Sequence, residues 1–199
     1  MDESRLTLLP DQTLLPLLPS LLGRLATVGR SINAHNLCSV LDGAMKQIFD
    51  DAVEGVGATE GSVWLLDQAT ESLTLAYNTG PNSQTLVGKF KQPLSAGLIS
   101  MVFSTEQSFV ENEVFKNSLQ DKTLDSTLKV RTKAMIAVPF YFLGACRGVA
   151  SCVELASPTR EGLDTKGFDE NDEAVFRNVS VILGRLIEHW AIRKTIGLE

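Results

Sequence analysis

The apolar positions near the start of the chain recur every three or four residues, which predicts an amphipathic helix over residues 19–31. Pro19 fits the first turn of that helix, because its missing N–H would have no partner there. The positions that form this pattern are Leu14, Leu15, Leu18, Leu21, Leu22, Leu25 and Val28.

A second helical pattern begins after residue 36. Asn33 or Asn36 can cap this helix, since a short polar side chain accepts a hydrogen bond from its first turn. The pattern ends in the glycine-containing stretch 55–57. Its expected buried side consists of Leu37, Val40, Leu41, Ala44, Ile48, Phe49 and Ala52.

The pattern then changes to that of strands and turns. We expect strands at residues 62–67, 73–77 and 86–93, a short helix opening at Gly97, and a short strand at 108–112. The polar segment 113–132 is expected to form short helices and a mobile loop. Residues 134–143 and 148–155 are apolar and are joined near Gly144, which predicts a hairpin of two central strands.

The strongest helical pattern follows a polar loop at 158–167. Acidic residues fall in the first turns of this helix and basic residues in its last turn, an arrangement that suits the helix dipole. Strands grouped between flanking helices predict an α+β fold, an antiparallel sheet with helices packed on one face. The apolar stripe comprises Val175, Phe176, Val179, Ile182, Leu183, Leu186, Ile187 and Trp190.

The composition narrows the class of protein. The chain has 199 residues, 44% hydrophobic, with a formal net charge of -6, so one globular domain is expected. Phosphate binding needs clustered Lys and Arg, so we expect no nucleic-acid partner. No apolar run is long enough to span a bilayer, and the leucine-rich start lacks the basic region and cleavage site of a signal peptide. A cytoplasmic protein without a membrane partner is therefore expected.

Three cysteines and two histidines are the residues that could carry thiol or metal chemistry. Cys38, Cys146 and Cys152 have the spacing of neither a zinc site nor a disulfide framework, and their apolar surroundings predict packing roles. His35 precedes one helix and His189 lies near the end of another, so we expect both at the surface. The sequence thus indicates no metal site, no cofactor and no catalytic residue.

Several segments resemble GAF domains, in the order and spacing of that family from about Asn36 to Trp190. Residues 61–67 are similar to the opening strand of the family, and residues 93–98 with 102–105 to its strand-to-helix segment. Residues 134–139 resemble the central strand that ends in Val-Pro, and Gly148-Val149 the start of the last strand. Phe168 with Asp172-Glu173 resembles the entry to the last helix. The resemblance implies a GAF domain at 34–196 and an N-terminal amphipathic helical extension at 1–33.

The resemblance also implies a pocket between the outer face of the sheet and the segment 108–133. Pockets for small molecules are mostly apolar with few polar anchors. A small-molecule ligand is therefore expected, and the sequence leaves its identity open. The candidate pocket residues are Trp64, Phe90, Phe115, Leu119, Leu124, Leu128 and Met135.

Specialised members of the family provide alternatives that the residues do not favour. Members that bind cyclic nucleotides carry an Asn-Lys pair where this chain has Ala156-Ser157, and bilin-binding members use a Cys that residues 108–133 lack. Free methionine-(R)-sulfoxide reductase has this fold and three cysteines, but its catalytic cysteines lie where this chain has Ser95, Ala96 and residues 111–117. A thiol-based reductase remains the alternative enzyme.

The terminal helices predict a homodimer, since their apolar stripes are wider than one sheet face needs. An alternative is that the N-terminal helix folds back over its own domain. In resembling proteins such helices lead to output domains. We therefore expect a sensory module in bacterial-type signal transduction that acts on a separate output protein or is part of a longer chain. Met1 favours a natural start. A ligand-free dimerisation or docking module is the alternative. The candidate interface residues are Leu18, Leu22, Leu25, Val175, Val179, Ile182, Leu186 and Trp190.

Overall fold

The computed structural model describes residues 11–156 and 166–198 of the chain. Six strands form one antiparallel sheet in the order β3-β2-β1-β6-β5-β4. The predicted hairpin of two central strands is confirmed, with Leu143 and Gly144 at its turn. The strands are β1 (Glu60–Asp67), β2 (Ser72–Asn78), β3 (Lys91–Pro93), β4 (Phe109–Glu111), β5 (Thr132–Phe142) and β6 (Ala145–Leu155).

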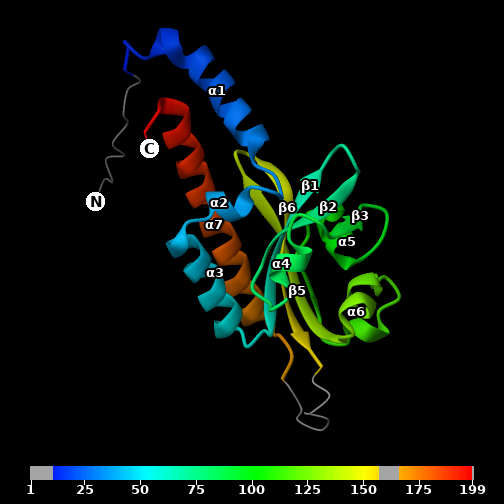
Figure 1. Cartoon of the computed structure of the whole chain (residues 1–199). Helices are drawn as coiled ribbons and strands as arrows, with labels where there is room; N and C mark the ends of the chain where they lie inside the picture. The colour runs from blue at the N-terminus through cyan, green and yellow to red at the C-terminus, as the bar shows by residue number, and fades with distance from the viewer. Residues whose placement is uncertain (1–10, 157–165, 199) are drawn as a thin grey trace, which may run out of the picture.

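Helices cover both faces of this sheet (Figure 1). The long helices α3 and α7 lie on one face, and the short helices α4, α5 and α6 lie on the other. The predicted α+β fold is therefore confirmed. The helices are η1 (Leu15–Leu17), α1 (Leu18–Ser31), α2 (Leu37–Val40), α3 (Gly43–Gly55), α4 (Ser83–Leu86), α5 (Leu98–Thr105), η2 (Val114–Lys116), α6 (Thr123–Leu128) and α7 (Glu170–Ile196).

The alternation of side chains along the strands divides the core into two layers. In β1, Val63 and Leu65 are buried beneath α3 and α7, whereas Trp64 between them belongs to the opposite layer. In β5, Ile136 and Val138 join the first layer and Ala137 joins the second. The side chain of Trp64 is thus directed towards the face that the short helices cover.

Helix α7 is fixed firmly at its first turn. The Asp169 carboxylate accepts hydrogen bonds from the backbone N–H groups of Asn171 and Asp172, and Asp172 reaches back to the N–H of Asp169. This reciprocal arrangement satisfies donors that a helix start otherwise leaves unpaired. Phe168, just before it, is buried in the layer beneath α3 and α7. The predicted role of this segment as the entry to the last helix agrees with these contacts.

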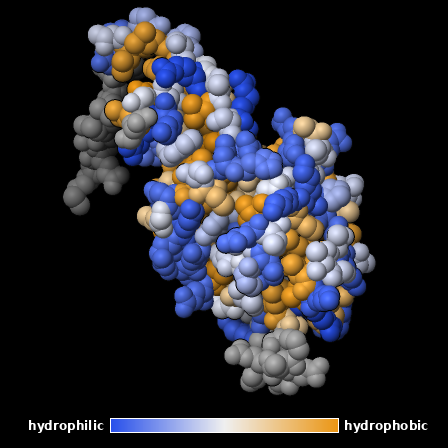
Figure 2. All heavy atoms as spheres, viewed as in Figure 1, coloured by the Kyte–Doolittle hydropathy of each residue, from blue (hydrophilic) through white to orange (hydrophobic). Residues whose placement is uncertain are grey.

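Helix α1 lies beside the C-terminal half of α7 and extends beyond the sheet (Figure 1). The expected helix at 19–31 is present, one residue longer at its start. Its leucines are largely uncovered, and Figure 2 shows hydrophobic atoms at the surface of this end of the molecule. The exposed residues of η1 and α1 include Leu14, Leu15, Leu17, Leu18 and Leu22.

Two expectations need correction. The single helix expected after residue 36 is broken at Leu41, whose backbone is extended. Asn36 stands at the N-cap position of α2 without a side-chain cap, and the helix restarts as α3 with Asp42 as the capping residue. The third strand, expected at 86–93, is confined to Lys91–Pro93, because Leu86 ends helix α4 and accepts the N–H groups of Lys89 and Phe90 in a turn. The loop expected at 158–167 lies mainly outside the described residues.

No helix within the described parts of the chain combines the length and apolar character that crossing a membrane requires.

Candidate ligand-binding cavity

A partly open cavity lies between the sheet and the short helices on the face opposite α7. It has a volume of about 90 Å³, and its walls come from β1, β2, β5 and β6 on the sheet side. The segment from Gln120 to Val130, which includes α6, and the start of α5 at Gly97 cover it. The cavity therefore occupies the position that the sequence predicted, between the outer sheet face and part of the segment 108–133.

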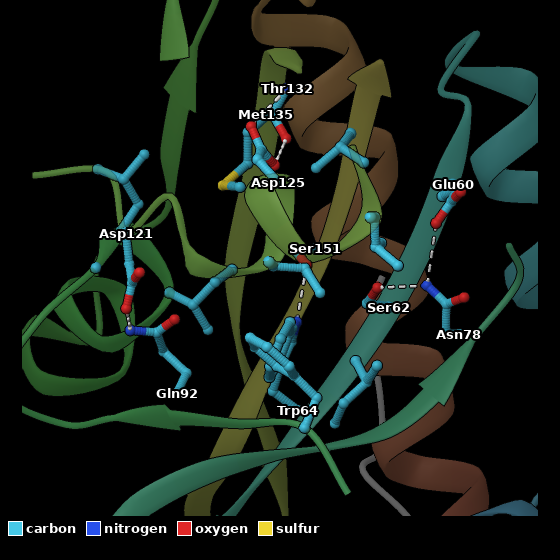
Figure 3. Close-up of a pocket in the computed structure, with 18 of the residues that line it drawn as sticks. Glu60, Ser62, Trp64, Asn78, Gln92, Asp121, Asp125, Thr132, Met135 and Ser151 are labelled. Carbon is cyan, nitrogen blue, oxygen red and sulfur yellow. Dashed lines mark hydrogen bonds between the residues drawn. The ribbon is translucent and has the colours of Figure 1, made fainter. Parts of the chain in front are cut away.

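The base of the cavity is apolar and aromatic. The Trp64 and Phe90 rings meet edge to face with their centroids 6.0 Å apart. The indole Nε1 of Trp64 donates a hydrogen bond to Ser151 Oγ at 3.2 Å, so the polar edge of this buried ring is satisfied within the sheet (Figure 3). Leu75 and Met135 also line this region. The base can therefore accept apolar ligand surface without leaving an indole donor unpaired.

The first polar group at the wall is centred on Gln92. Its Nε2 donates to Asp121 Oδ2 at 2.9 Å and to the carbonyl oxygen of Ala96 at 2.7 Å. Asp121 Oδ1 accepts the backbone N–H of Thr123 at 2.8 Å. The hydrogen bonds from Thr123 and Gln92 lower the pKa of the Asp121 carboxyl, which is therefore ionised near neutral pH.

A second polar group holds α6 to β5. Asp125 Oδ2 accepts the backbone N–H of Thr132 at 2.8 Å, and Oδ1 accepts the Thr132 hydroxyl at 2.7 Å. The Gln120 Nε2 adds a third hydrogen bond to Asp125 at 3.0 Å. With three donors on one carboxylate, Asp125 anchors the cover of the cavity to the sheet.

A third polar group lies where β1 and β2 meet, on the far side of the cavity from Asp121 (Figure 3). Asn78 Nδ2 donates to Ser62 Oγ at 3.0 Å and approaches Glu60 Oε2 at 3.4 Å. Its Oδ1 accepts the backbone N–H of Gly80 at 2.9 Å. Glu60 thus brings a carboxylate to the wall with only a weak hydrogen bond from a neutral amide.

The predicted pocket residues divide into two sets. Phe115 and Leu119 are not among the residues that line this cavity. Phe115 lies in η2 beneath the Arg131 guanidinium, 3.8 Å from its ring centroid, and Leu119 is 56% exposed. Both precede Gln120, the residue at which this segment first lines the cavity. The five that line it are Trp64, Phe90, Leu124, Leu128 and Met135.

Sequence reasoning missed the polar wall. Gln92 and Asn78 are buried polar residues in strands, and a polar residue at a position of strand alternation that faces the core is the signal that could have identified them. Glu60 and Asp121 carried no comparable signal, because Glu60 stands at the start of β1 and Asp121 lies in the polar loop before α6. Gln92 and Asp121 lie 29 positions apart, a pairing that only the fold creates.

None of the three cysteines lines the cavity. Cys152 is buried in the layer beneath α7, and burial raises the pKa of its thiol to about 12. Burial also raises the pKa values of Cys38 and Cys146, whose Sγ atoms lie 3.3 Å from the Ala76 carbonyl and 3.5 Å from the Gly148 carbonyl. All three are therefore protonated near neutral pH, the form that is a poor nucleophile.

Candidate metal ligands are equally dispersed. His35 and His189 are both exposed, as the sequence predicted. Across residues 11–156 and 166–198, no group of three or more His, Cys, Asp or Glu side chains is arranged to hold a metal ion.

The residues predicted for a dimer interface lie on α1 and α7. Four of them, Leu18, Leu22, Val175 and Ile182, are between 40% and 55% exposed. Leu25 is half-buried, and Val179, Leu186 and Trp190 pack partly against the core of their own domain. The uncovered part of the predicted stripe is therefore its outer edge.

Comparison with known proteins gives matches in structure alone. No family model matches the sequence, and no curated protein matches it. The GAF domain from a phosphoenolpyruvate-protein phosphotransferase of Coxiella burnetii is similar with a TM-score of 0.62 and 18% identity, over 90% of this chain and 97% of that one. The corresponding Acinetobacter domain gives 0.58 and 17%, over 92% and 97%. Free methionine-R-sulfoxide reductase from Neisseria meningitidis, solved with its substrate, gives 0.55 and 18%, over 96% and 98%.

Proposed function

We propose that this chain, which has the fold of GAF domains, is a sensory or regulatory module that binds a small molecule and dimerises through its terminal helices. The observation that carries the proposal is the cavity on the outer face of the sheet. Its apolar base and its few polar wall groups are the composition typical of small-molecule sites. Helix α6 forms part of the cover of the cavity and is held mainly by Asp125, so ligand binding can change the position of this one segment.

The cavity supports a compact ligand. Its volume of about 90 Å³ is below the roughly 300–1,000 Å³ of typical ligand pockets. A cyclic nucleotide would need a larger space and a cation for its phosphate, and no Lys, Arg or His of residues 11–156 and 166–198 lines this cavity. Ala156 replaces the Asn of the cyclic-nucleotide-binding members, and its neighbour Ser157 lies outside the described residues. These observations favour a smaller signal molecule.

Dimerisation is supported by apolar surface that the folded chain leaves open. Exposed apolar side chains on α7 include Val175, Ile182, Ile192 and Ile196, and α1 with its exposed leucines lies beside the C-terminal half of this helix (Figure 1). Exposed apolar surface of this extent is typical of an interaction site. A second copy of the chain would cover it symmetrically, and ligand binding would then act on the arrangement of the paired helices.

A non-enzymatic role is part of the proposal. A thiol reductase needs a reactive thiolate at the substrate, and the three thiols here are protonated and lie away from the cavity. Two of the similar solved GAF domains come from phosphoenolpyruvate-protein phosphotransferases, in which the domain is one part of a larger protein. An output partner, in the same polypeptide or separate, fits a module of this kind.

A ligand-free docking module is the second candidate. The small cavity volume and the exposed terminal helices favour it, because both would be found in a domain that only dimerises and holds a partner.

One experiment separates the two candidates. The purified chain is screened by thermal shift against amino acids, amines, 2-oxo acids, cyclic nucleotides and other metabolites, with native mass spectrometry in parallel. A ligand at 100 times its Kd stabilises a fold by roughly 2.7 kcal/mol, which produces a measurable rise in Tm. A dimer with a ligand-dependent Tm supports the sensor. A dimer whose Tm no compound changes contradicts ligand binding and favours the docking module.

A further inference from the structure

The side-chain amide of Gln92 can present only its oxygen to the cavity. Both hydrogens of its Nε2 are used, one by Asp121 Oδ2 and one by the Ala96 carbonyl. Rotating the amide by half a turn would place Oε1 against two acceptors, so the orientation is fixed by the partners. Gln92 is only 6% exposed, and its Oε1, which receives no hydrogen bond from the described residues, is turned towards the cavity (Figure 3).

Gln120 repeats this arrangement on the cover of the cavity. Gln120 lines the cavity, and its Nε2 donates to Asp125, which again assigns the nitrogen to the protein and leaves the oxygen as an open acceptor. The Gln120 Oε1 is buried and has no hydrogen-bond partner among the described residues. A buried acceptor without a donor is costly, so Gln120 Oε1, together with the unpaired Gln92 Oε1 at the same cavity, indicates a ligand that supplies donors.

The remaining lining side chains offer few donors. The amide nitrogen of Asn78 and the indole nitrogen of Trp64 donate within the protein, and the Thr132 hydroxyl donates to Asp125. The hydroxyl oxygens of Ser62 and Ser151 accept hydrogen bonds from Asn78 and Trp64, so the hydrogens of these two hydroxyls remain as donors for a ligand. The wall is therefore dominated by acceptors.

The charge of the wall also favours a ligand that supplies hydrogen-bond donors, because the charged residues there are acidic. Glu60, Asp121 and Asp125 line the cavity, and among the described residues no Lys, Arg or His does. The start of α5 also borders it, and a helix start attracts anions. However, Asp121 already lies against that end, since its Cβ is 3.3 Å from where a Cβ on Gly97 would be. The Asp121 carboxylate thus offsets the helix dipole, which leaves a wall that repels anions.

The aromatic base suits the same kind of ligand. Trp64 and Phe90 form an edge-to-face pair at the cavity. An organic cation over an aromatic face is attracted by the ring quadrupole, most strongly when the pair is shielded from water. The cavity volume of about 90 Å³ compares with roughly 150 Å³ for a cavity that holds benzene, which limits the ligand to a few heavy atoms beside its charged group.

From these contacts we propose that the cavity binds a compact molecule that carries a protonated amine. Gln92 Oε1, Gln120 Oε1 and the carboxylate of Asp121 or Glu60 accept the ammonium hydrogens, and Trp64 with Phe90 covers the carbon skeleton. The proposal rests on the proposed function, because it names the ligand class of the same cavity.

The test compares compounds that differ only in their polar group. Branched and linear amines of up to six heavy atoms are each paired with the alcohol and the carboxylate of the same skeleton, such as isopentylamine, isopentanol and 3-methylbutanoate. Binding is measured by isothermal titration calorimetry with the full chain. We expect the best amine to bind at least about tenfold more tightly than its alcohol, and the carboxylates not to bind.

Two variants identify which carboxylate binds the ammonium group of the ligand. Glu60→Gln and Asp121→Asn keep the shape of the side chains and remove one negative charge each. We expect at least one of them to weaken amine binding about tenfold and to leave alcohol binding within about twofold. Glu54→Gln makes the same charge change at an exposed position of α3 and should alter neither. Melting of each variant without ligand checks its fold, and Glu60→Gln remains informative if Asp121→Asn is unstable, because Glu60 accepts only the weak hydrogen bond from Asn78.

The outcomes separate this proposal from the one on which it rests. Preferential binding of carboxylates, or equal binding of all three members of a set, overturns the amine and leaves small-molecule sensing intact. Amine binding that neither variant weakens also overturns the proposal, because it would place the amine elsewhere. If no compound in this panel or in the wider metabolite screen binds, both proposals fail together.

Discussion

Asn112 binds the backbone of Phe168 with both ends of its side-chain amide. Nδ2 donates to the Phe168 carbonyl oxygen at 2.9 Å, and Oδ1 accepts the Phe168 N–H at 2.8 Å. Asn112 follows β4 at one edge of the sheet, whereas Phe168 precedes α7, so this pair of hydrogen bonds links the sheet edge to the start of the last helix. No carboxylate or hydroxyl of similar size could form both bonds, because only an amide offers a donor and an acceptor side by side.

The Asn112 amide is therefore expected to contribute measurably to stability. Asn112→Ala removes both hydrogen bonds and should lower the free energy of unfolding by about 1–2 kcal/mol. Asn112→Asp keeps the acceptor but sets a carboxylate against the Phe168 carbonyl, so its cost should be at least as large. Urea unfolding of the two variants measures this, with the exposed Asn178→Ala as a control. If Asn112→Ala lowered the free energy of unfolding no more than the control does, the two hydrogen bonds to Phe168 would not contribute to stability.

A pair of helical glycines gives a second prediction, with opposite signs. A Cβ on Gly184 would collide with the Tyr141 carbonyl oxygen, because α7 crosses β5 closely there, whereas a Cβ on Gly23 would meet nothing within 4 Å. Gly184→Ala should therefore destabilise the protein by about 1–3 kcal/mol through overpacking. Gly23→Ala should stabilise α1 by roughly 0.5–1 kcal/mol. Thermal melting measures both, and an increase in Tm for Gly184→Ala would show that α7 can move away without cost.

The larger elements of this fold could be predicted from the sequence, because their signals are local. The stripe from Phe176 to Ile187 predicted α7, and the apolar runs on either side of Gly144 predicted the central hairpin. The break at Leu41 was missed although Asp42 carried a signal: its side chain caps α3 by accepting the N–H of Met45 at 2.8 Å. The long apolar stripe predicted one continuous helix, and this pattern outweighed the single capping residue within it.

The site was only partly predictable, for a different reason. Apolar lining residues such as Trp64 and Met135 could be named, since strand alternation assigns them to one face. The wall depends on contacts between distant segments, such as Gln120 with Asp125 and Thr132, and on which end of each amide the protein occupies. Amide orientation is set by tertiary partners and leaves no periodic trace in the sequence.

Burial of Cys152 gives a third prediction, a loss of stability in alkali. Its pKa is raised from 9.0 to about 12 by burial, so the folded state holds a proton that the unfolded state releases. The stabilisation is thus fully present below pH 9 and is lost as the pH rises towards 12. The free energy of unfolding of the wild type, relative to Cys152→Ala, should fall by about 1.4 kcal/mol between pH 8 and pH 10.

Urea titrations at several pH values measure this difference. The tyrosines, including Tyr141, whose pKa the hydrogen bond to Glu106 raises to about 12, are present in both proteins and cancel. A difference between wild type and Cys152→Ala that stays constant from pH 8 to pH 10 would mean that the thiol is not protected from ionisation.

The last prediction concerns the face of α7 that would meet a second copy in the proposed dimer. Ile182 lies on the predicted stripe with Val175 and is 46% exposed, whereas Val181 is 55% exposed but points about 100° away around the helix. Ile182→Glu would bury a charge in the proposed apolar interface and should raise the dimer Kd at least about a hundredfold. Val181→Glu places the same charge outside that stripe and should leave the dimer intact. Both positions are exposed in the single chain, so neither substitution should unfold it.

Sedimentation equilibrium decides between the two faces of α7. A dimer that Val181→Glu disrupts and Ile182→Glu does not would place the interface on the other side of α7. A wild type that is monomeric at all concentrations would exclude the dimer altogether.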